Sequence, residues 1–198
     1  LVVRAIAESK ARQPGLQLRI LGDTSDQLTE LLEQERIDVA IARFTQPADL
    51  GRFTFEPLGN EHLAVVVRTG HPLAGRAAPD LAELVAEWPW ILQPEASPAR
   101  VALEAAFARR QLPPPADIIE CGSVFAMLQL VQITDAILVL TEAVVRDHLR
   151  TGLMVSLDLE ITEPLTPFGI LLRTGQVPSA ALEGFLGLLR QQAAGAAA

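Results

Sequence analysis

The sequence predicts an α/β protein built from two lobes. Helical and strand periods alternate along the whole chain, several of the strands are nearly continuous apolar runs, and 198 residues suffice for one large domain or two small ones. An apolar run such as residues 37–42 is typical of a strand buried on both faces of a parallel sheet. Alternating strands and helices therefore favour mostly parallel sheets covered by helices.

The first part of the chain reads as helix, strand, helix and strand. Residues 1–13 have the spacing of an amphipathic helix, which a Pro-Gly pair ends, and residues 16–20 alternate between apolar and polar side chains as a strand does. Thr24 stands at the N-cap of the next helix, and residues 37–42 close the unit.

The rest of the chain continues this alternation. Asp80, Ser97 and Ser123 stand where helices begin, and Pro98 suits the first position of a helix. Further strands are predicted at residues 53–58, 62–68, 90–92, 117–120, 136–140, 153–157 and 168–172, and further helices after Asp80 and at residues 98–110, 124–132, 142–150 and 179–192.

Charge and composition exclude several kinds of protein. The chain carries 16 Lys and Arg against 24 Asp and Glu, and a net charge of -8 repels nucleic acid. No apolar run is long enough to span a bilayer, and charges within the first ten residues argue against a secretory leader. A lone cysteine, Cys121, allows no internal disulfide. We expect a cytoplasmic protein with no membrane partner.

The sequence offers no catalytic or metal-binding pattern. His62, His71 and His148 are scattered without zinc-ligand spacing, and we expect them on the surface. Ser123 lacks the second glycine of a nucleophile elbow. Cys121 is either a redox-sensing thiol at a helix N-terminus or a small buried thiol, and we favour the buried thiol because the chain holds no second cysteine. No glycine-rich nucleotide-binding loop is present. We therefore expect no enzyme activity, no cofactor and no metal.

A series of short motifs covers nearly the whole chain in a fixed order. They are Gln13-Pro14-Gly15-Leu16, Gly22, Arg36-Ile37-Asp38-Val39-Ala40-Ile41, Glu61-His62-Leu63, His71-Pro72-Leu73-Ala74, Trp90-Ile91-Leu92, Ser97-Pro98-Ala99-Arg100, Gly152-Leu153 and Phe168-Gly169-Ile170 with Arg173. In this order they resemble the effector-binding domain of LysR-type transcriptional regulators. The resemblance implies a type 2 periplasmic-binding-protein fold, with two Rossmann-like lobes around an inducer cleft.

The resemblance also implies a domain division and two missing parts. Lobe I would comprise residues 1–67 and 166–198, and lobe II residues 68–165. Such domains open with a strand, whereas Leu1 already lies in the first helix, so we expect the first strand of the fold to be missing. The family's N-terminal winged helix-turn-helix is absent from these residues as well.

The function implied by the resemblance is inducer sensing. A small metabolite, a sugar, sugar acid or aromatic acid, would bind in the interlobe cleft and control DNA binding by the absent helix-turn-helix, so that DNA is a partner only through that domain. We expect a homodimer, or a tetramer at full length, with residues 28–35 and 125–132 in the dimer interface. A solute-binding protein of a transporter and an enzyme on the same fold are the alternatives.

Candidate ligand contacts follow from where α/β folds bind their ligands, together with the resemblance. Ligands of open α/β sheets bind at the carboxyl ends of strands, near helix N-termini. Thr24, Ser97 and Ser123 either cap helices or contact the ligand, and Arg43 and Arg100 either select a carboxylate or lie exposed. The full set of candidates is Thr24, Ser25, Arg43, Phe44, Ser97, Pro98, Arg100, Gly122, Ser123, Val124 and Thr141.

Overall fold

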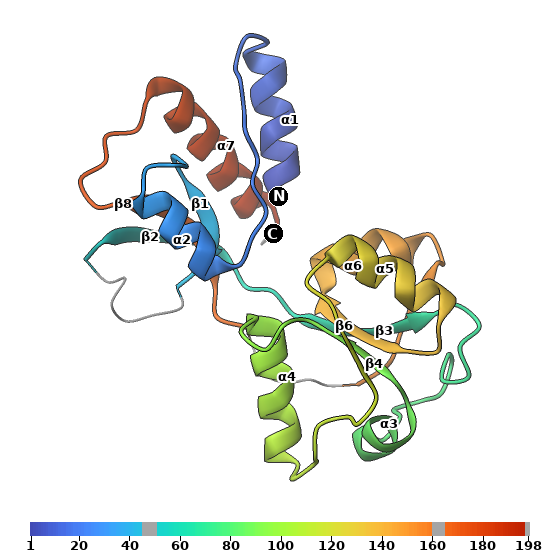
Figure 1. Cartoon of the computed structure of the whole chain (residues 1–198). Coiled ribbons are helices and arrows are strands. Elements are labelled where there is room, and N and C mark those ends of the chain that lie inside the picture. The colour runs from blue at the N-terminus through green and yellow to red at the C-terminus, as the bar shows by residue number, and fades with distance from the viewer. Residues whose placement is uncertain (45–50, 160–164, 197–198) are drawn as a thin grey trace. The chain divides into compact units, whose positions relative to one another are not determined.

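A computed structural model describes residues 1–44, 51–159 and 165–196 (Figure 1). The chain divides into two compact units, lobe I with Leu1–Asn60 and Thr166–Ala198, and lobe II with Glu61–Leu165. Lobe I is thus made from both ends of the chain. Over the described ranges, no helix is long and apolar enough to cross a membrane.

In its described residues, lobe I has a three-stranded sheet and three helices. Its elements are α1 (Val2–Arg12), α2 (Ser25–Glu33), β1 (Ala40–Arg43), β2 (Phe53–Gly59), β8 (Phe168–Arg173) and α7 (Ala180–Ala196). The strand order is β1-β8-β2, and β8 is antiparallel to both neighbours. The expectation of parallel pairing is wrong for β1, because its described partner comes from the far end of the chain and runs in the opposite direction.

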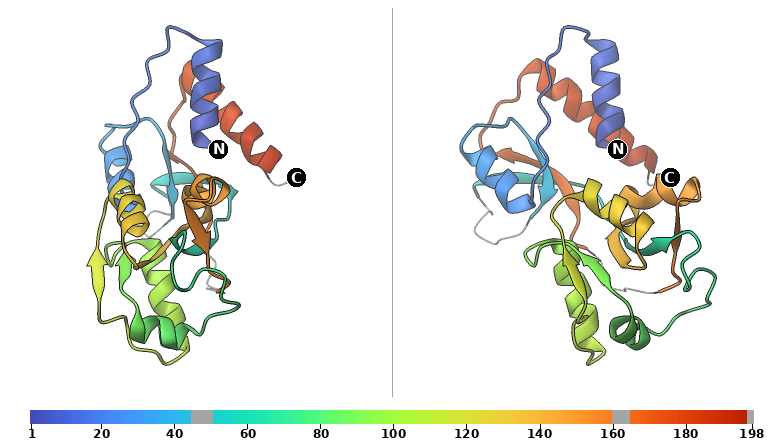
Figure 2. Two further views of the ribbon diagram at one scale, coloured as in Figure 1. Left: turned by 90° about the vertical axis from the view of Figure 1, so that its right-hand side faces the viewer. Right: turned by 45° about the vertical axis from the view of Figure 1, so that its right-hand side comes forward.

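One predicted element of lobe I is absent. Residues 16–20 are not a strand in the structure, although apolar and polar residues alternate along this segment of the sequence. Alternation alone does not make a strand, because a strand also needs a partner for its backbone N–H and C=O groups. The views in Figures 1 and 2 agree that the chain turns back after α1 and runs alongside this helix.

Helix α7 packs the C-terminal segment of lobe I against its N-terminal segment. It packs against α1, and Leu186 and Leu189 of α7 join Ala5 of α1 in a fully buried core (Figure 2). Arg190 of α7 binds Glu56 of β2, with Nε 2.9 Å from Oε1 and Nη2 2.9 Å from Oε2. These hydrogen bonds lower the pKa of the Glu56 carboxyl.

Lobe II is a five-stranded mixed sheet between two layers of helices. Its elements are β3 (Leu63–Arg68), α3 (Leu81–Glu87), β4 (Trp90–Leu92), α4 (Pro98–Arg109), β5 (Ile118–Glu120), α5 (Val124–Ile133), β6 (Ile137–Thr141), α6 (Glu142–Arg150) and β7 (Met154–Ser156). The order is β5-β4-β6-β3-β7, in which β4 is parallel to β5 and β6, while β3 is antiparallel to β6 and β7. Side chains of α3 and α4 form one core on this sheet, and side chains of α5 and α6 form the other.

His71 is buried, which corrects the expectation of three surface histidines. The residue is 3% exposed and its ring lies 4.6 Å from that of Trp88. Its Nε2 lies 3.1 Å from the Asp135 carbonyl oxygen, and its Nδ1 accepts a hydrogen bond from the backbone N–H of Leu73 at 3.0 Å. The ring therefore joins the loop after β3 to the residues just before β6.

Candidate functional site

The lobe II sheet gathers three helix N-termini at one edge. Strands β5, β4 and β6 are parallel neighbours, so their carboxyl ends lie at the same edge of the sheet. Each strand is followed by a helix, α5, α4 and α6 respectively. The free N–H groups in the first turn of a helix attract anions and hydroxyl groups. The topology thus places three such turns where a ligand can reach them together.

Ser97 caps the helix that follows the central strand of this edge. Its Oγ accepts a hydrogen bond from the backbone N–H of Arg100 at 3.2 Å and lies 3.2 Å from Oε1 of Gln93. Ser97 is buried, and Pro98 occupies the first helical position. The predicted cap is therefore confirmed, and a ligand contact by the same residue stays a prediction.

Arg100 is buried rather than exposed, which corrects one of the two alternatives considered for it. The residue is 7% exposed, and its Nε donates a hydrogen bond to Oε1 of Glu104 at 2.5 Å. Its Nη1 is buried and has no hydrogen-bond partner among the residues that the structure describes. A buried guanidinium nitrogen normally has an acceptor, so this atom is an unmet hydrogen-bonding demand within the candidate set.

Ser123 and Thr141 stand at the other two helix starts. Ser123 is exposed, and its Oγ accepts a hydrogen bond from the backbone N–H of Ala126 at 3.3 Å. Gly122 and Val124, on either side of it, are exposed as well. Thr141 precedes α6 but makes no side-chain capping hydrogen bond, so its hydroxyl is not committed to the helix.

In lobe I, the candidates lie at the start of α2 and the end of β1. Thr24 caps α2, with its Oγ1 3.4 Å from the backbone N–H of Gln27. The Ser25 hydroxyl accepts a hydrogen bond from the backbone N–H of Arg43 at 3.2 Å, which joins the two elements. The Phe44 ring packs edge-on against Phe55, with centroids 5.2 Å apart.

Arg43 is also buried, at 7% exposure, so the exposed alternative is wrong for it too. Its Nη1 donates a hydrogen bond to the carbonyl oxygen of Thr166, and its guanidinium carbon lies 6.0 Å from the centre of the Phe168 ring. These contacts tie the end of β1 to the segment that enters β8. They give Arg43 a structural role that sequence reasoning did not weigh.

The structure brings the candidates together in two groups, one in each lobe. Thr24, Ser25, Arg43 and Phe44 lie in lobe I, and Ser97, Pro98, Arg100, Gly122, Ser123, Val124 and Thr141 lie in lobe II. Sequence reasoning missed Gln93, which contacts Ser97 and directly follows β4. The signal that could have identified Gln93 is its position, since it is a polar residue at the carboxyl end of a buried strand. No cluster of three His, Cys, Asp or Glu side chains in the described ranges is placed to hold a metal.

Comparisons with known proteins place the chain in a family. Residues 1–194 match the model of the LysR substrate binding domain. The chain is 32% identical over 170 residues to the HTH-type transcriptional regulator GbpR of Azospirillum brasilense, covering 86% of this chain and 50% of that protein. It is 26% identical over 192 residues to the HTH-type transcriptional regulator PcaQ of Agrobacterium fabrum, covering 96% of this chain and 61% of that protein. The chain thus spans about half of the first relative and somewhat more of the second.

Solved structures show the same fold. The effector-binding domain of QuiR in complex with shikimate matches 98% of this chain and 90% of its own, with a TM-score of 0.77 and 18% identity. The BenM effector-binding domain with its effector benzoate matches 100% of this chain and 87% of its own, with a TM-score of 0.71 and 23% identity. The predicted two-lobed α/β architecture of the periplasmic-binding-protein type is confirmed. By its sequence match and its fold, the chain belongs to the LysR substrate-binding domain family.

Proposed function

We propose that the chain is the effector-sensing part of a transcriptional regulator, and that its effector is a small organic acid. The observation that carries the choice of an acid is Arg100, whose Nη1 is buried beside the capped start of α4 and has no acceptor among the residues described. A carboxylate satisfies a guanidinium nitrogen and helix N–H groups at once, whereas a neutral hydroxyl satisfies them more weakly. The solved neighbours that hold shikimate and benzoate, both carboxylates, support this choice over a neutral sugar.

DNA binding is assigned to a part of the full-length protein outside these residues. The relatives are named HTH-type transcriptional regulators and are longer than this chain. The net charge of -8 makes residues 1–198 themselves a poor partner for DNA. Effector binding would act by favouring one of two conformations of the regulator. The names of the relatives do not favour a solute-binding protein of a transporter.

A ligand screen tests the proposed effector class. We expect thermal stability to rise with benzoate-like or shikimate-like acids and not with their neutral amides or methyl esters. At a hundredfold excess over Kd, an effector stabilises the folded protein by about 2.7 kcal/mol. Differential scanning fluorimetry followed by calorimetry measures this difference. Stabilisation by neutral sugars and by none of the acids would contradict the choice of an organic acid.

The homodimer stays a prediction, and helix α5 offers a direct test of it. Phe125 is 74% exposed on this helix, within the surface that the sequence predicts to pair. Water contact with so large an apolar side chain is unfavourable, and a partner subunit would relieve it. We expect Phe125→Asp to produce a monomer in analytical ultracentrifugation, while Val101→Asp on α4, also at an exposed apolar position, leaves the association unchanged. A wild-type monomer at high micromolar concentration would contradict the prediction.

A further inference from the structure

The side-chain amide of Gln93 is held in one orientation by Ser97. Ser97 Oγ already accepts a hydrogen bond from the backbone N–H of Arg100 at 3.2 Å, so the hydroxyl hydrogen needs an acceptor of its own. The hydroxyl donates that hydrogen to Oε1 of Gln93, with the two oxygens 3.2 Å apart. Turning the amide over would take this acceptor away. The carbonyl side of the Gln93 amide therefore faces Ser97.

The amino side of the same amide is left without a partner. Gln93 Nε2 makes no hydrogen bond to any residue that the structure describes. Gln93 directly follows β4 and is only half-buried, so a ligand at the carboxyl end of this strand can reach it. The residue thus offers two N–H donors, while its carbonyl oxygen is already bound to Ser97.

The first turn of α4 also has an unused donor. Pro98 has no N–H, and the N–H groups of Arg100 and Val101 bind the side chain and the carbonyl of Ser97. The remaining amide of this turn is that of Ala99, which has no backbone partner in the described part of the chain. This N–H group lies in the same turn as the cap that Gln93 supports.

Arg100 adds a side-chain donor whose direction is fixed. The residue is 7% exposed, and Glu104, one turn further along α4, accepts a hydrogen bond from its Nε at 2.5 Å. Because the guanidinium group is planar, fixing Nε also fixes the direction of Nη1. Nη1 is buried and has no acceptor in the described ranges. A buried donor without an acceptor indicates a ligand that supplies one.

We propose that Gln93 is a specificity-determining residue, which selects an ionised carboxylate over groups that donate hydrogen bonds. This inference rests on the proposed function and narrows the effector further. The unused polar groups of Gln93, Ala99 and Arg100 are all donors, and the acceptors of Gln93 and Ser97 are committed to the cap. A carboxylate only accepts hydrogen bonds, whereas a primary amide would bring its own hydrogens against these donors.

Replacing the amino group of Gln93 by an acceptor tests this role. Gln93→Glu keeps the size of the side chain and the acceptor for Ser97, but a carboxylate oxygen takes the place of Nε2. We expect the Kd of an acid to rise about a hundredfold, because two carboxylates then face each other. The Kd of the matching primary amide should fall about tenfold, because its amino group gains a charged acceptor. Titration calorimetry on the full-length protein measures both constants, with the acids of the ligand screen, benzoate and shikimate first, and their primary amides.

Two further variants separate specificity from structure. Gln111→Glu is the matched control, since Gln111 is exposed just beyond the opposite end of α4, and it should leave both constants unchanged. Gln93→Met removes the donor without adding a charge, so it answers the same question if the charged variant unfolds. It should raise the Kd of the acid about tenfold and change that of the amide much less. An equal loss for acid and amide would show that Gln93 only supports the cap, and would overturn the proposal.

The wild-type protein distinguishes failure of this inference from failure of the proposed function. If the wild type binds an acid and Gln93→Glu keeps the same ratio of acid to amide affinity, the role of Gln93 is wrong and the proposed function stands. If the wild type binds none of the acids, the proposed effector class is wrong and the role of Gln93 falls with it. Reversal of the preference in Gln93→Glu supports both.

Discussion

Gly169→Ala is expected to destabilise lobe I by about 3 kcal/mol, because an added Cβ has no room in the middle of the sheet. It would contact the backbone carbonyl oxygen of Glu56 at far below van der Waals distance, and it would lie 2.6 and 2.8 Å from Cε2 and Cζ of Phe55. The Phe55 ring can turn away, but the Glu56 carbonyl belongs to β2, which pairs with β8 on either side of this point. Relief therefore requires the two strands to separate.

Urea unfolding followed by circular dichroism measures this loss, with Gly184→Ala as the matched control. Gly184 lies within α7, and a Cβ there meets nothing within 4 Å. Alanine in a helix is favoured over glycine by about 1 kcal/mol, so the control should be slightly more stable than the wild type. If Gly169→Ala unfolds within about 0.5 kcal/mol of the wild type, β2 and β8 are less closely packed than the structure has them. The close approach of β2 thus explains why glycine stands in the Phe168-Gly169-Ile170 motif, which the sequence motif alone does not show.

Features set by neighbouring residues were predictable from the sequence. The caps at Thr24, Ser97 and Ser123 depend on a side-chain oxygen and a backbone N–H a few residues ahead, and the structure forms all three. Most helices and strands were found for the same reason, since their periodicity is local. The positions of the cap residues at one edge of the lobe II sheet also followed, because parallel strands align their carboxyl ends.

Features set by distant residues were not predictable in this way. Strand β1 was expected in a parallel sheet, but its described partner β8 lies far along the chain and runs the other way. His71 was expected at the surface, yet the Asp135 carbonyl and Trp88 enclose it. The burial of Arg43 likewise depends on Thr166 and Phe168. Residues 16–20 do not form a strand for the complementary reason, since their local pattern was right but no strand in the described part of the chain pairs with them.

Ser97→Asp should separate helix capping from effector binding, because the two roles respond in opposite ways to a negative charge. Aspartate caps a helix as well as serine does, but Ser97 is buried, so the carboxylate also loses hydration and we expect lobe II to be destabilised by about 2 kcal/mol while it stays folded. A carboxylate effector would meet a like charge at the start of α4, and such contacts cost several kcal/mol. A loss of about 3 kcal/mol corresponds to a Kd about a hundredfold higher. Titration calorimetry with an organic acid found in the screen measures this change.

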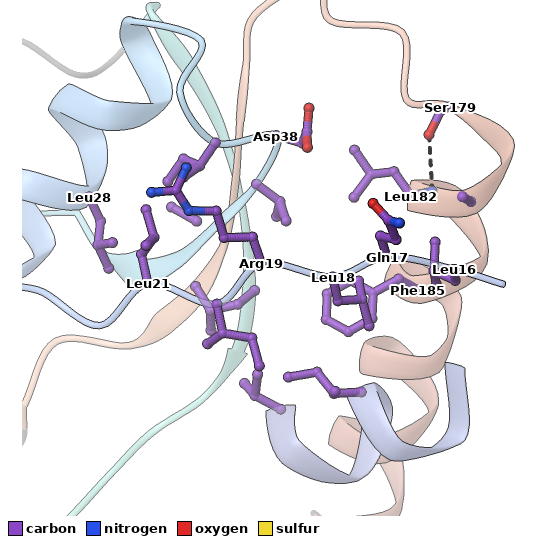
Figure 3. Close-up of a pocket in the computed structure, with 18 of the residues that line it drawn as sticks. Leu16, Gln17, Leu18, Arg19, Leu21, Leu28, Asp38, Ser179, Leu182 and Phe185 are labelled. Carbon is purple, nitrogen blue, oxygen red and sulfur yellow. Dashed lines mark hydrogen bonds between the residues drawn. The ribbon is translucent and has the colours of Figure 1, made fainter. Parts of the chain in front are cut away.

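The control for this experiment is the same substitution at another helix cap. Ser179 caps α7 in lobe I, where its Oγ accepts a hydrogen bond from the backbone N–H of Leu182 at 3.2 Å (Figure 3). Ser179→Asp adds the same charge far in sequence from the lobe II strand ends and should leave the affinity unchanged. Ser97→Ala, in contrast, should lower stability by about 1 kcal/mol through loss of the cap, while affinity falls much less than in Ser97→Asp. If Ser97→Asp binds the acid as tightly as the wild type, Ser97 acts only as a cap. The acid must then bind elsewhere, because an anion at the start of α4 cannot be indifferent to that charge.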